Sequence, residues 1–527
     1  MPQVAESSLI KAVRPAFFVV FGVFVAIFFV VLQGLAMFRF LVLVAGLGLI
    51  SPVFPAFAQA AAPAAQAPTD LPTGERWLKH FREDLLPFWK VADAWGSPRG
   101  DFPTFRGNDG RAVDWAKPPE ELAKAPAWIK ENFGREYVRM KSRQTYFYGV
   151  AYHLTGDPKM LVLARDGVAF IRKEALDPAT GSAVSYWEKG LPKPEILART
   201  SQDLAYAELG LAMYYYLTRD EAVLLDIKKL KRHIFTQYWN PQWQALRWVV
   251  KDGPAAEHLR QELVAQLDQV NAYLLLLTPI LPERDRKEWT ADLKRLAQVM
   301  VRDYHDADRH LFWGTIHDPA QKRLGSRHTD FGHSAKAYWM LERIGRLTED
   351  PALVELATTG ARAVLKQAYL PDSGTWGSRL RPDDTVDSDK EWWIYAELDQ
   401  LAETLALADP AQGAPLPRTT EFWFRRMVDP VNHEVWGGAG GAEFAPWQGP
   451  KIHQWKSGYH SAEHALVGYL TAQALHGQPA TLYFAPRDAK ALLRPYFFEG
   501  TVTSRTQQPL SGFPGRQKVE VVFTDLR

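Results

Sequence analysis

Long runs of apolar residues with helical spacing recur along most of the chain, and each run ends at a short polar loop. The loops start at a leucine, and most continue with an acid, a proline or both. Six of them occur in chain order: LTGDP from Leu154, LTRDE from Leu217, LPERD from Leu281, LTEDP from Leu347, LADPA from Leu407 and LHGQP from Leu475. They recur at intervals of 60 to 68 residues. Such a period indicates a repeated unit that buries its apolar face only against its neighbours.

Each of these loops is predicted to connect two helices. An acid followed by proline, as at Asp157 and Pro158, is typical of a helix cap followed by the first helical position. An interval of this length holds two helices of about 15 to 20 residues with their loops. The unit is therefore a helical hairpin, and six loops predict six hairpins. The period leaves open whether the hairpins close into a ring or spread as an open superhelix. The number six, and aromatic-rich loops that would converge on an axis, favour the ring.

Strand signals are few, so the body of the chain is expected to be all-α. The exception is GTVTSRTQQPLSGFPGRQKVEVVF, which begins at Gly500, alternates in polarity and contains turn residues. This pattern predicts a short C-terminal β hairpin. We therefore expect a helical domain over residues 69–485 and a β extension over residues 486–527.

Residues 1–68 have the composition of a targeting segment and linker rather than of a folded domain. Ala16–Leu32 is an unbroken apolar run, and a second apolar stretch follows Met37, which is the better candidate for the start of translation. Small residues near Ala58–Ala60 form a cleavage signal, so we expect export to the periplasm or secretion. The alternative is a protein anchored in the membrane by Ala16–Leu32.

The composition is globular and nearly neutral. The chain has 527 residues, of which 47% are hydrophobic, and 62 basic residues balance 60 acidic ones. No basic excess points to nucleic acid. Cysteine is absent, which excludes disulfides, thiolate metal sites and cysteine nucleophiles. The glycines of Gly437–Gly441 are not followed by the lysine of a phosphate-binding loop, and no dinucleotide fingerprint or nucleophile elbow is present.

Four chemically interesting residues share one position within the repeat. His333, Trp393 and His460 lie 14, 14 and 15 residues before their loops, and Arg143 lies 11 before Leu154. Each therefore sits about 20 Å from the marked loop, at the opposite end of its helix. In a closed ring these side chains would surround one mouth, which is the expected geometry of a small-molecule site.

Four motifs resemble those of the N-acylglucosamine 2-epimerase family, which includes cellobiose 2-epimerases and aldose–ketose isomerases. They are KEWWIYAELDQLAETLA from Lys390, WKSGYH from Trp455, FGHSAKAYWML from Phe331 and RQTYFYG from Arg143. The resemblance covers about residues 75–480 and implies an (α/α)6 barrel. This agrees with the six hairpins predicted from the repeat.

The resemblance implies chemistry at C2 of a reducing sugar. A base removes the C2 proton next to the carbonyl of the open chain, and a cis-enediol forms. Return of the proton to C2 from the other face gives the epimer, and its return to C1 gives the ketose. Histidine suits both steps, because its usual pKa lies near neutrality. The family pattern makes His333 and His460 the two bases.

The resemblance also assigns the surroundings of the sugar. Arg143 would stabilise the charge that develops on the carbonyl oxygen, Trp393 would stack on the sugar, and Glu397 would support the site one turn further along the same helix. The residues expected around the substrate are Arg143, Trp393, Glu397, Trp455, Tyr459 and Asn271. No cofactor or metal is expected, the partner is a small-molecule sugar, and membrane contact is expected only through the N-terminal segment. The sequence gives no indication of oligomeric state.

Two walls of the predicted pocket depart from the family pattern. Lys336 stands three residues after the first histidine, where the family carries an acid, and a nearby lysine lowers the pKa of a histidine. Leu204 and Tyr206 occupy places where many members have Asn or His, and Asn271 stands near an expected histidine. Either the sugar or the activity is expected to differ from that of typical members.

Three other functions remain open. His460 and His464 in HSAEH have a spacing that permits zinc binding, but a third ligand is missing nearby. A glycoside hydrolase on the same barrel would need two carboxylates across a cleft, for which Asp203 and Asp330 have the right position in the repeat. A sugar-binding relative without catalytic activity is the third alternative.

Overall fold

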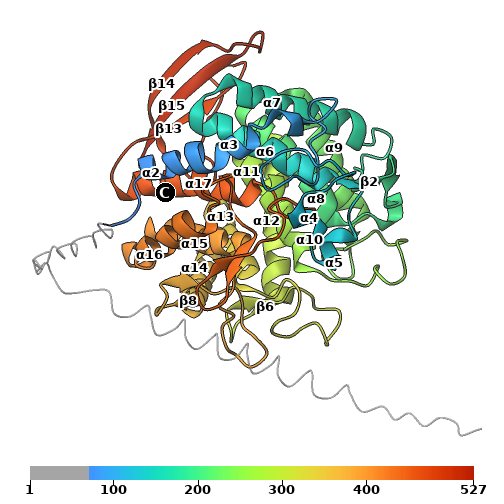
Figure 1. The fold of residues 1–527 in the computed structure, drawn as a ribbon, viewed down its shortest axis with the longest axis vertical. Helices are drawn as coiled ribbons and strands as arrows, with labels where there is room; N and C mark the ends of the chain where they lie inside the picture. Colours follow the sequence, from blue (N-terminus) through green and yellow to red (C-terminus); the bar gives the residue numbers. More distant parts are fainter. Residues whose placement is uncertain (1–69, 489) are drawn as a thin grey trace, which may run out of the picture. The chain divides into compact units, whose positions relative to one another are not determined.

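The computed structural model describes residues 70–488 and 490–527, and this part of the chain is mostly helical (Figure 1). The predicted targeting segment over residues 1–68 lies outside the described residues.

Six long helical segments form the interior. They are α6 (Val138–Thr155), α8 (Ser201–Thr218), the continuous run of α10 (Leu263–Gln269), η5 (Val270–Leu274), α11 (Leu275–Leu277) and η6 (Thr278–Ile280), α13 (Phe331–Leu347), α15 (Trp392–Ala406) and α17 (Tyr459–Leu475). Every residue of α8 except Asp203 is buried. Helices that are apolar on all sides require such an interior position. Among them, α6 packs against both α8 and α17, and α15 packs against both α13 and α17.

The remaining long helices cover this interior with one apolar face. They are α2 (Gly74–Lys79) with η1 (His80–Leu85) and α3 (Leu86–Trp89), α7 (Pro158–Phe170) with η3 (Ile171–Ala175), α9 (Glu221–Gln237), α12 (Glu283–Val299) with η7 (Met300–Tyr304), α14 (Pro351–Ala368), and α16 (Leu416–Phe422) with η9 (Trp423–Met427). In α9 the buried residues recur every three or four positions, from Val223 to Ile234, as expected of a helix that is buried on one side. Short helices in the connections are η2 (Ala92–Trp95), α4 (Glu120–Ala123), α5 (Ala127–Lys130), η4 (Ile196–Ala198) and η8 (Pro410–Gly413).

The polar loops cap the helices that follow them. Asp157, Asp220 and Asp350 each accept a backbone N–H at the start of α7, α9 and α14. This confirms the predicted connections between helices at these loops. The loop at Leu475 is an exception, because α17 is followed by a strand and packs instead against α2 near the start of the described residues. The sixth helical pair is therefore made from the two ends of the chain rather than from a continuous hairpin.

Short strands occupy the connections between helical pairs. The sequence analysis did not predict these strands. They are β1 (Arg135–Tyr137), β2 (Tyr186–Glu188), β3 (Leu191–Lys193), β4 (Trp239–Asn240), β5 (Ala245–Leu246), β6 (His305–Asp306), β7 (Leu311–Phe312), β8 (Tyr369–Leu370), β9 (Thr375–Trp376), β10 (Lys390–Glu391), β11 (Gly438–Gly440) and β12 (Ala445–Pro446). All pair as antiparallel ribbons of two or three strands. They shape the loops at the N-terminal ends of the inner helices.

The C-terminal strands form a larger sheet than the expected hairpin. β14 (Thr501–Pro509) pairs with β15 (Gln517–Thr524), and β13 (Ala480–Phe484) adds a third antiparallel strand on the other side of β15. Alternate residues of β15, including Val519, Val521 and Phe523, are fully buried. The sheet therefore packs one face on the protein, and its first strand belongs to the segment that was assigned to the helical domain.

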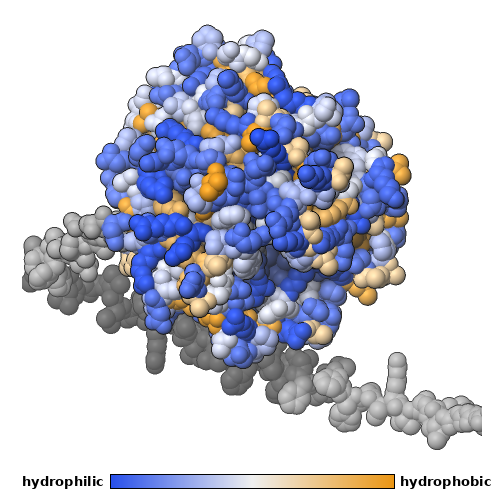
Figure 2. All heavy atoms as spheres, viewed as in Figure 1, coloured by the Kyte–Doolittle hydropathy of each residue, from blue (hydrophilic) through white to orange (hydrophobic). Residues whose placement is uncertain are grey.

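The surface and the core follow the usual division of polarity. On the face shown in Figure 2, hydrophilic side chains predominate and hydrophobic ones are scattered. The segment Leu263–Ile280 is long and apolar enough to cross a membrane by length and composition, but 94% of it is buried inside the protein. Its hydropathy is therefore that of a core helix.

Candidate functional site

A cavity of 570 Å³ opens at the N-terminal ends of the inner helices. Side chains from α6, α8, α13, α15 and α17 line it, together with residues of the loops that precede them. Arg143, His333, Trp393 and His460, the four residues that share a position in the repeat, all lie on its wall. The lining also includes Trp128, Gln202, Tyr206, His328, Asp330, Lys336, Arg379, Glu391 and Trp455.

His333 stands at the start of α13 and is held by Asp330. One oxygen of Asp330 accepts the backbone N–H of His333 at 2.8 Å and so caps the helix, while the other lies 2.7 Å from His333 Nδ1. Burial opposes ionisation of Asp330, but His333 and Arg379 outweigh it and hold the pKa of this carboxyl below its usual range. A charged acceptor therefore fixes the imidazole.

His460 lies in the first turn of α17, and a carboxylate also approaches its Nδ1, here without forming a hydrogen bond. Its Nδ1 lies 3.3 Å from Glu397 Oε1, and Trp339 donates a hydrogen bond of 3.1 Å to the other oxygen of Glu397. Burial lowers the pKa of His460 to about 4, with Lys336 adding to the effect and Glu397 opposing it. Burial also opposes ionisation of Glu397, but His460 and Lys336 lower its pKa overall. At neutral pH the site thus contains a neutral imidazole beside a carboxylate.

Trp393 packs near both imidazoles. Its ring centroid is 4.7 Å from that of His333 and 5.9 Å from that of His460. The ring packs against Gly332, where an added Cβ would come within 2.7 Å of Trp393 Cζ3. Glycine at this position therefore lets the indole approach the first turn of α13.

Arg143 is buried on the wall formed by α6 and α8. It donates a hydrogen bond of 2.6 Å to the carbonyl oxygen of Trp455, and its guanidinium carbon lies 4.1 Å above the ring of Tyr206. Its Nε has no hydrogen-bond partner among the described residues. Because the residue lines the cavity, its positive charge is suited to attract an oxygen of a ligand.

Three residues that were expected around the substrate lie behind the wall instead. Glu397 is fully buried beneath His460. Asn271 and Tyr459 hydrogen-bond to each other through both amide atoms, at 2.8 and 3.0 Å, and the Tyr459 ring packs 4.5 Å from that of His460. Their side chains do not line the cavity. The structure therefore places these three residues in a supporting position behind the cavity wall.

The sequence analysis missed a buried carboxylate, Asp268, on α10. It receives hydrogen bonds from Gln202 at 2.8 Å and Tyr206 at 3.1 Å, and Lys336 Nζ lies 3.5 Å away. A signal was available, because Asp268 lies 13 residues before its loop at Leu281 and so shares the repeat position of the other site residues.

Glu463 extends the buried cluster beneath His460. Its Oε1 accepts a hydrogen bond of 2.6 Å from Tyr496, whose hydroxyl also lies 2.6 Å from that of Tyr146. Burial and the charge of Glu397 raise the pKa of Glu463 to about 7. Glu463 therefore keeps its proton up to near neutral pH.

The structure also places the residues proposed for a zinc site and for a glycoside hydrolase. His464 lies apart from His460 and contacts Asp399 at 3.3 Å, between the rings of two tryptophans. The donor atoms within 4.8 Å of one another belong to Glu397, His460 and Glu463, so the zinc pair of His460 and His464 is not assembled. Of the two carboxylates that a glycoside hydrolase would need, Asp330 lines the cavity.

The second carboxylate proposed for a hydrolase, Asp203, is not on the cavity wall. It forms an ion pair with Arg139 at 2.7 Å and accepts a hydrogen bond from Thr200. The expected pair of Asp203 and Asp330 across the cleft is therefore absent.

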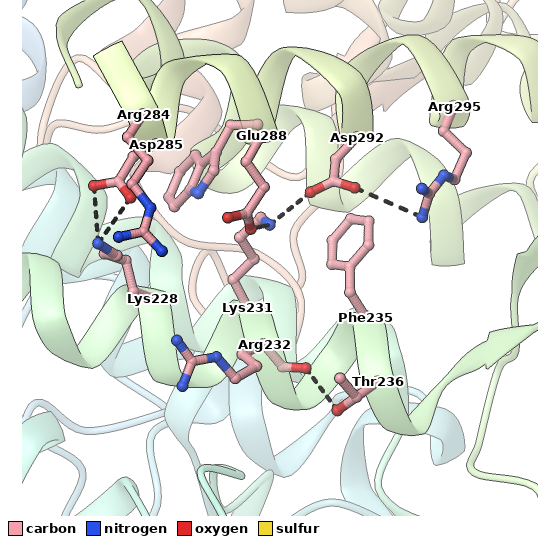
Figure 3. A pocket seen from close by; sticks show the side chains of 11 residues that line it. Lys228, Lys231, Arg232, Phe235, Thr236, Arg284, Asp285, Glu288, Asp292 and Arg295 are labelled. Carbon is pink, nitrogen blue, oxygen red and sulfur yellow. Dashed lines mark hydrogen bonds and ion pairs between the residues drawn. The ribbon is translucent and has the colours of Figure 1, made fainter. Parts of the chain in front are cut away.

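A second hollow, of 390 Å³, lies between the outer helices α9 and α12. Figure 3 shows its lysines facing acids across the two helices, with Lys228 on Asp285 and Lys231 on Asp292. These contacts tie the two helices together. The lining includes no histidine, so the first cavity is the better candidate for proton transfer.

Comparisons with known proteins agree with this choice. A model of the N-acylglucosamine 2-epimerase family matches residues 123–436, which ends before Trp455 and His460. No curated protein matches the sequence. The cellobiose 2-epimerase from Bacillus thermoamylovorans B4167 superposes with a TM-score of 0.63 at 15% identity, covering 75% of this chain and 98% of that one.

Two further solved structures are similar. The cellobiose 2-epimerase from Spirochaeta thermophila DSM 6192 has a TM-score of 0.63 at 16% identity and covers 76% of this chain and 97% of its own. A D-mannose isomerase has a TM-score of 0.61 at 16% identity, with 77% and 99% covered. At these identities the likeness establishes a shared fold.

Proposed function

The chain belongs to the N-acylglucosamine 2-epimerase family, whose members are carbohydrate epimerases and isomerases, and we propose that it transfers a proton at C2 of a reducing mono- or disaccharide. One observation carries the proposal. His333 and His460 line the same cavity, both pack against Trp393, and each has Nδ1 beside a buried carboxylate.

The carboxylates determine which nitrogen is available to the substrate. A carboxylate beside Nδ1 stabilises the tautomer that carries its proton there, which leaves the lone pair on Nε2. Asp330 acts in this way on His333, and Glu397 acts on His460. Nε2 of each ring is then the nitrogen that can take a proton from the substrate or return one to it.

The reaction follows from this arrangement. After the sugar ring opens, neutral His460 takes the C2 proton and the C–H electrons move to the carbonyl oxygen, giving an enediolate. The next step requires a proton on His333, which returns it to C2 from the opposite face and gives the epimer. Return of the proton to C1 gives the ketose instead. His460 suits the first step because its low pKa keeps it unprotonated at neutral pH.

The other residues of the wall bind and polarise the sugar. Arg143 lines the cavity, and its guanidinium is suited to hold the developing oxyanion. Trp393 and Trp455 offer aromatic faces for the apolar side of a sugar ring. We infer that the six inner helices close into a ring, the (α/α)6 barrel, because the contacts of α17 with α6 join the last inner helix to the first.

We also propose that the protein is exported to the periplasm or secreted, because the apolar segment that follows Met37 resembles a signal peptide. Edman sequencing of protein from a periplasmic fraction is expected to give a mature N-terminus near Ala58–Ala60. An intact N-terminus in the membrane fraction would establish anchoring by Ala16–Leu32 instead.

Incubation with a panel of reducing sugars in heavy water tests the catalytic proposal. Solvent deuterium is expected at C2 of the epimer, or at C1 of a ketose product, as read by NMR. The exchange is expected to disappear in His460→Ala, with the control Glu443→Gln, an exposed substitution, fully active. Cleavage of a glycosidic bond without exchange, or binding without turnover, would refute the proposal.

A further inference from the structure

Lys336 is a buried cation on the cavity wall that the family motif does not contain. It lies on α13, one turn after His333, and is 3% exposed. Its Nζ lies 3.5 Å from Asp268 Oδ1, and Tyr206 donates to the same oxygen at 3.1 Å. An ammonium group has three N–H donors, so this single long contact leaves donors for a ligand.

The surroundings keep Lys336 charged. Burial opposes its ionisation, but Tyr206, Asp268, Glu397 and Glu463 together raise the pKa of Lys336 above its ordinary value. The acids stabilise the charge without surrounding it, because Asp268 is the one carboxylate within 4.0 Å of Nζ among the described residues. The ammonium is therefore a permanent positive charge at the cavity.

Tyr206 links Lys336 to Arg143. The guanidinium of Arg143 lies 4.1 Å above the Tyr206 ring, and the hydroxyl of the same ring shares Asp268 with Lys336. Both cations line the cavity, and both contribute to the low pKa of His460. The wall beside His460 thus presents two cations where negative charge would develop on an enediolate.

We propose that Lys336 is a catalytic residue that donates a hydrogen bond to the sugar's carbonyl oxygen and stabilises the enediolate together with Arg143. This inference rests on the proposed function. Lys336 stays protonated throughout: the C–H electrons move onto the oxygen, the proton moves to His460, and the ammonium balances the new charge. Asp268 is a positioning residue, since it does not line the cavity and acts on the substrate through Lys336.

A structural role for Lys336 predicts different behaviour. If the ammonium only neutralised the buried acids, its loss would lower the melting temperature without a specific effect on turnover. If it binds the oxyanion, its loss acts on the transition state, where removal of one such donor lowers kcat by about 10²- to 10³-fold. The two roles therefore separate in kcat, KM and chemical rescue.

The central experiment is Lys336→Met, assayed by deuterium exchange with the sugar that the wild type turns over. We expect kcat to fall about 100-fold or more with KM changed by less than about threefold. In Lys336→Ala, added ethylammonium is expected to restore part of the rate in proportion to its concentration. Lys231→Met is the matched control, because Lys231 is equally buried and ion-paired with Asp292 but lies on the outer helix α9 (Figure 3).

The outcomes separate the two proposals. If the wild type exchanges no sugar, the proposed function fails. If the wild type is active and Lys336→Met keeps kcat within threefold, or if Lys336→Ala loses activity without rescue, the role of Lys336 is wrong while the histidine pair stands. Should Lys336→Met melt below the assay temperature, Lys336→Gln retains a donor for Asp268 but lacks the charge, and the same loss of kcat is expected.

Discussion

Glu463 is expected to destabilise the folded protein at neutral and alkaline pH. Its pKa is raised from 4.5 to about 7, first by burial and then by the charge of Glu397. Between these two values the folded protein keeps the proton while the unfolded chain has lost it, so stability falls as the pH rises and then levels off above 7. The shift corresponds to about 3 kcal/mol.

Glu463→Gln removes this effect while keeping the contacts. The amide oxygen still accepts the hydrogen bond of Tyr496, and the NH₂ group replaces the carboxyl proton as a donor. Near pH 4.5 the variant and the wild type should be equally stable, and at pH 8 the variant should be more stable by about 3 kcal/mol. For a chain of this size that is about 3 °C in Tm.

Differential scanning calorimetry at pH 5, 6, 7 and 8 measures the difference at one scan rate. The exposed Glu443→Gln controls for the change in net charge and should follow the wild type throughout. If the Tm difference between Glu463→Gln and the wild type stays constant across this range, the buried proton does not exist and the account of the cluster is wrong.

Three further predictions concern the cavity. Glu397→Gln should leave His460 without its charged acceptor and lower kcat by about 10-fold or more, and unchanged kcat in the exchange assay would contradict that arrangement. Gly332→Ala should displace the Trp393 ring and raise the KM for the preferred sugar several-fold. The Tm should change little, because the indole can move into the cavity. In the wild type, kcat/KM should fall as the pH drops through about 4, because His460 then becomes protonated; a profile flat down to pH 3 would exclude His460 as the base.

The sequence predicted the helical pairs because their signals are local. Asp157 and Asp350 lie next to the prolines that begin α7 and α14, and both cap these helices in the structure. The shared repeat position brought His333, Trp393 and His460 to one cavity because helices of equal length in a repeated unit place equivalent residues at the same end. The same rule would also have found Asp268.

What the sequence could not predict depends on contacts between distant segments. The third strand of the C-terminal sheet, β13, follows α17 directly and is short enough to pass for a loop. The pairing of Asn271 with Tyr459 joins residues 188 apart, and nothing in either motif indicates that the two side chains turn away from the cavity and satisfy each other. Burial of a polar side chain is decided by partners that no local pattern specifies.

Lys336 and Glu463 carry opposite charges at equivalent positions of their helices. Lys336 lies three residues after His333, and Glu463 lies three residues after His460. A buried cation is costly unless carboxylates balance it, and Glu463 contributes to the balance, since Lys336 and Glu463 each shift the other's pKa. Because helical residues three apart lie on one face, each of these side chains faces the same buried region as its histidine. The cation near His333 and the acid near His460 therefore offset each other in the buried region behind the two histidines.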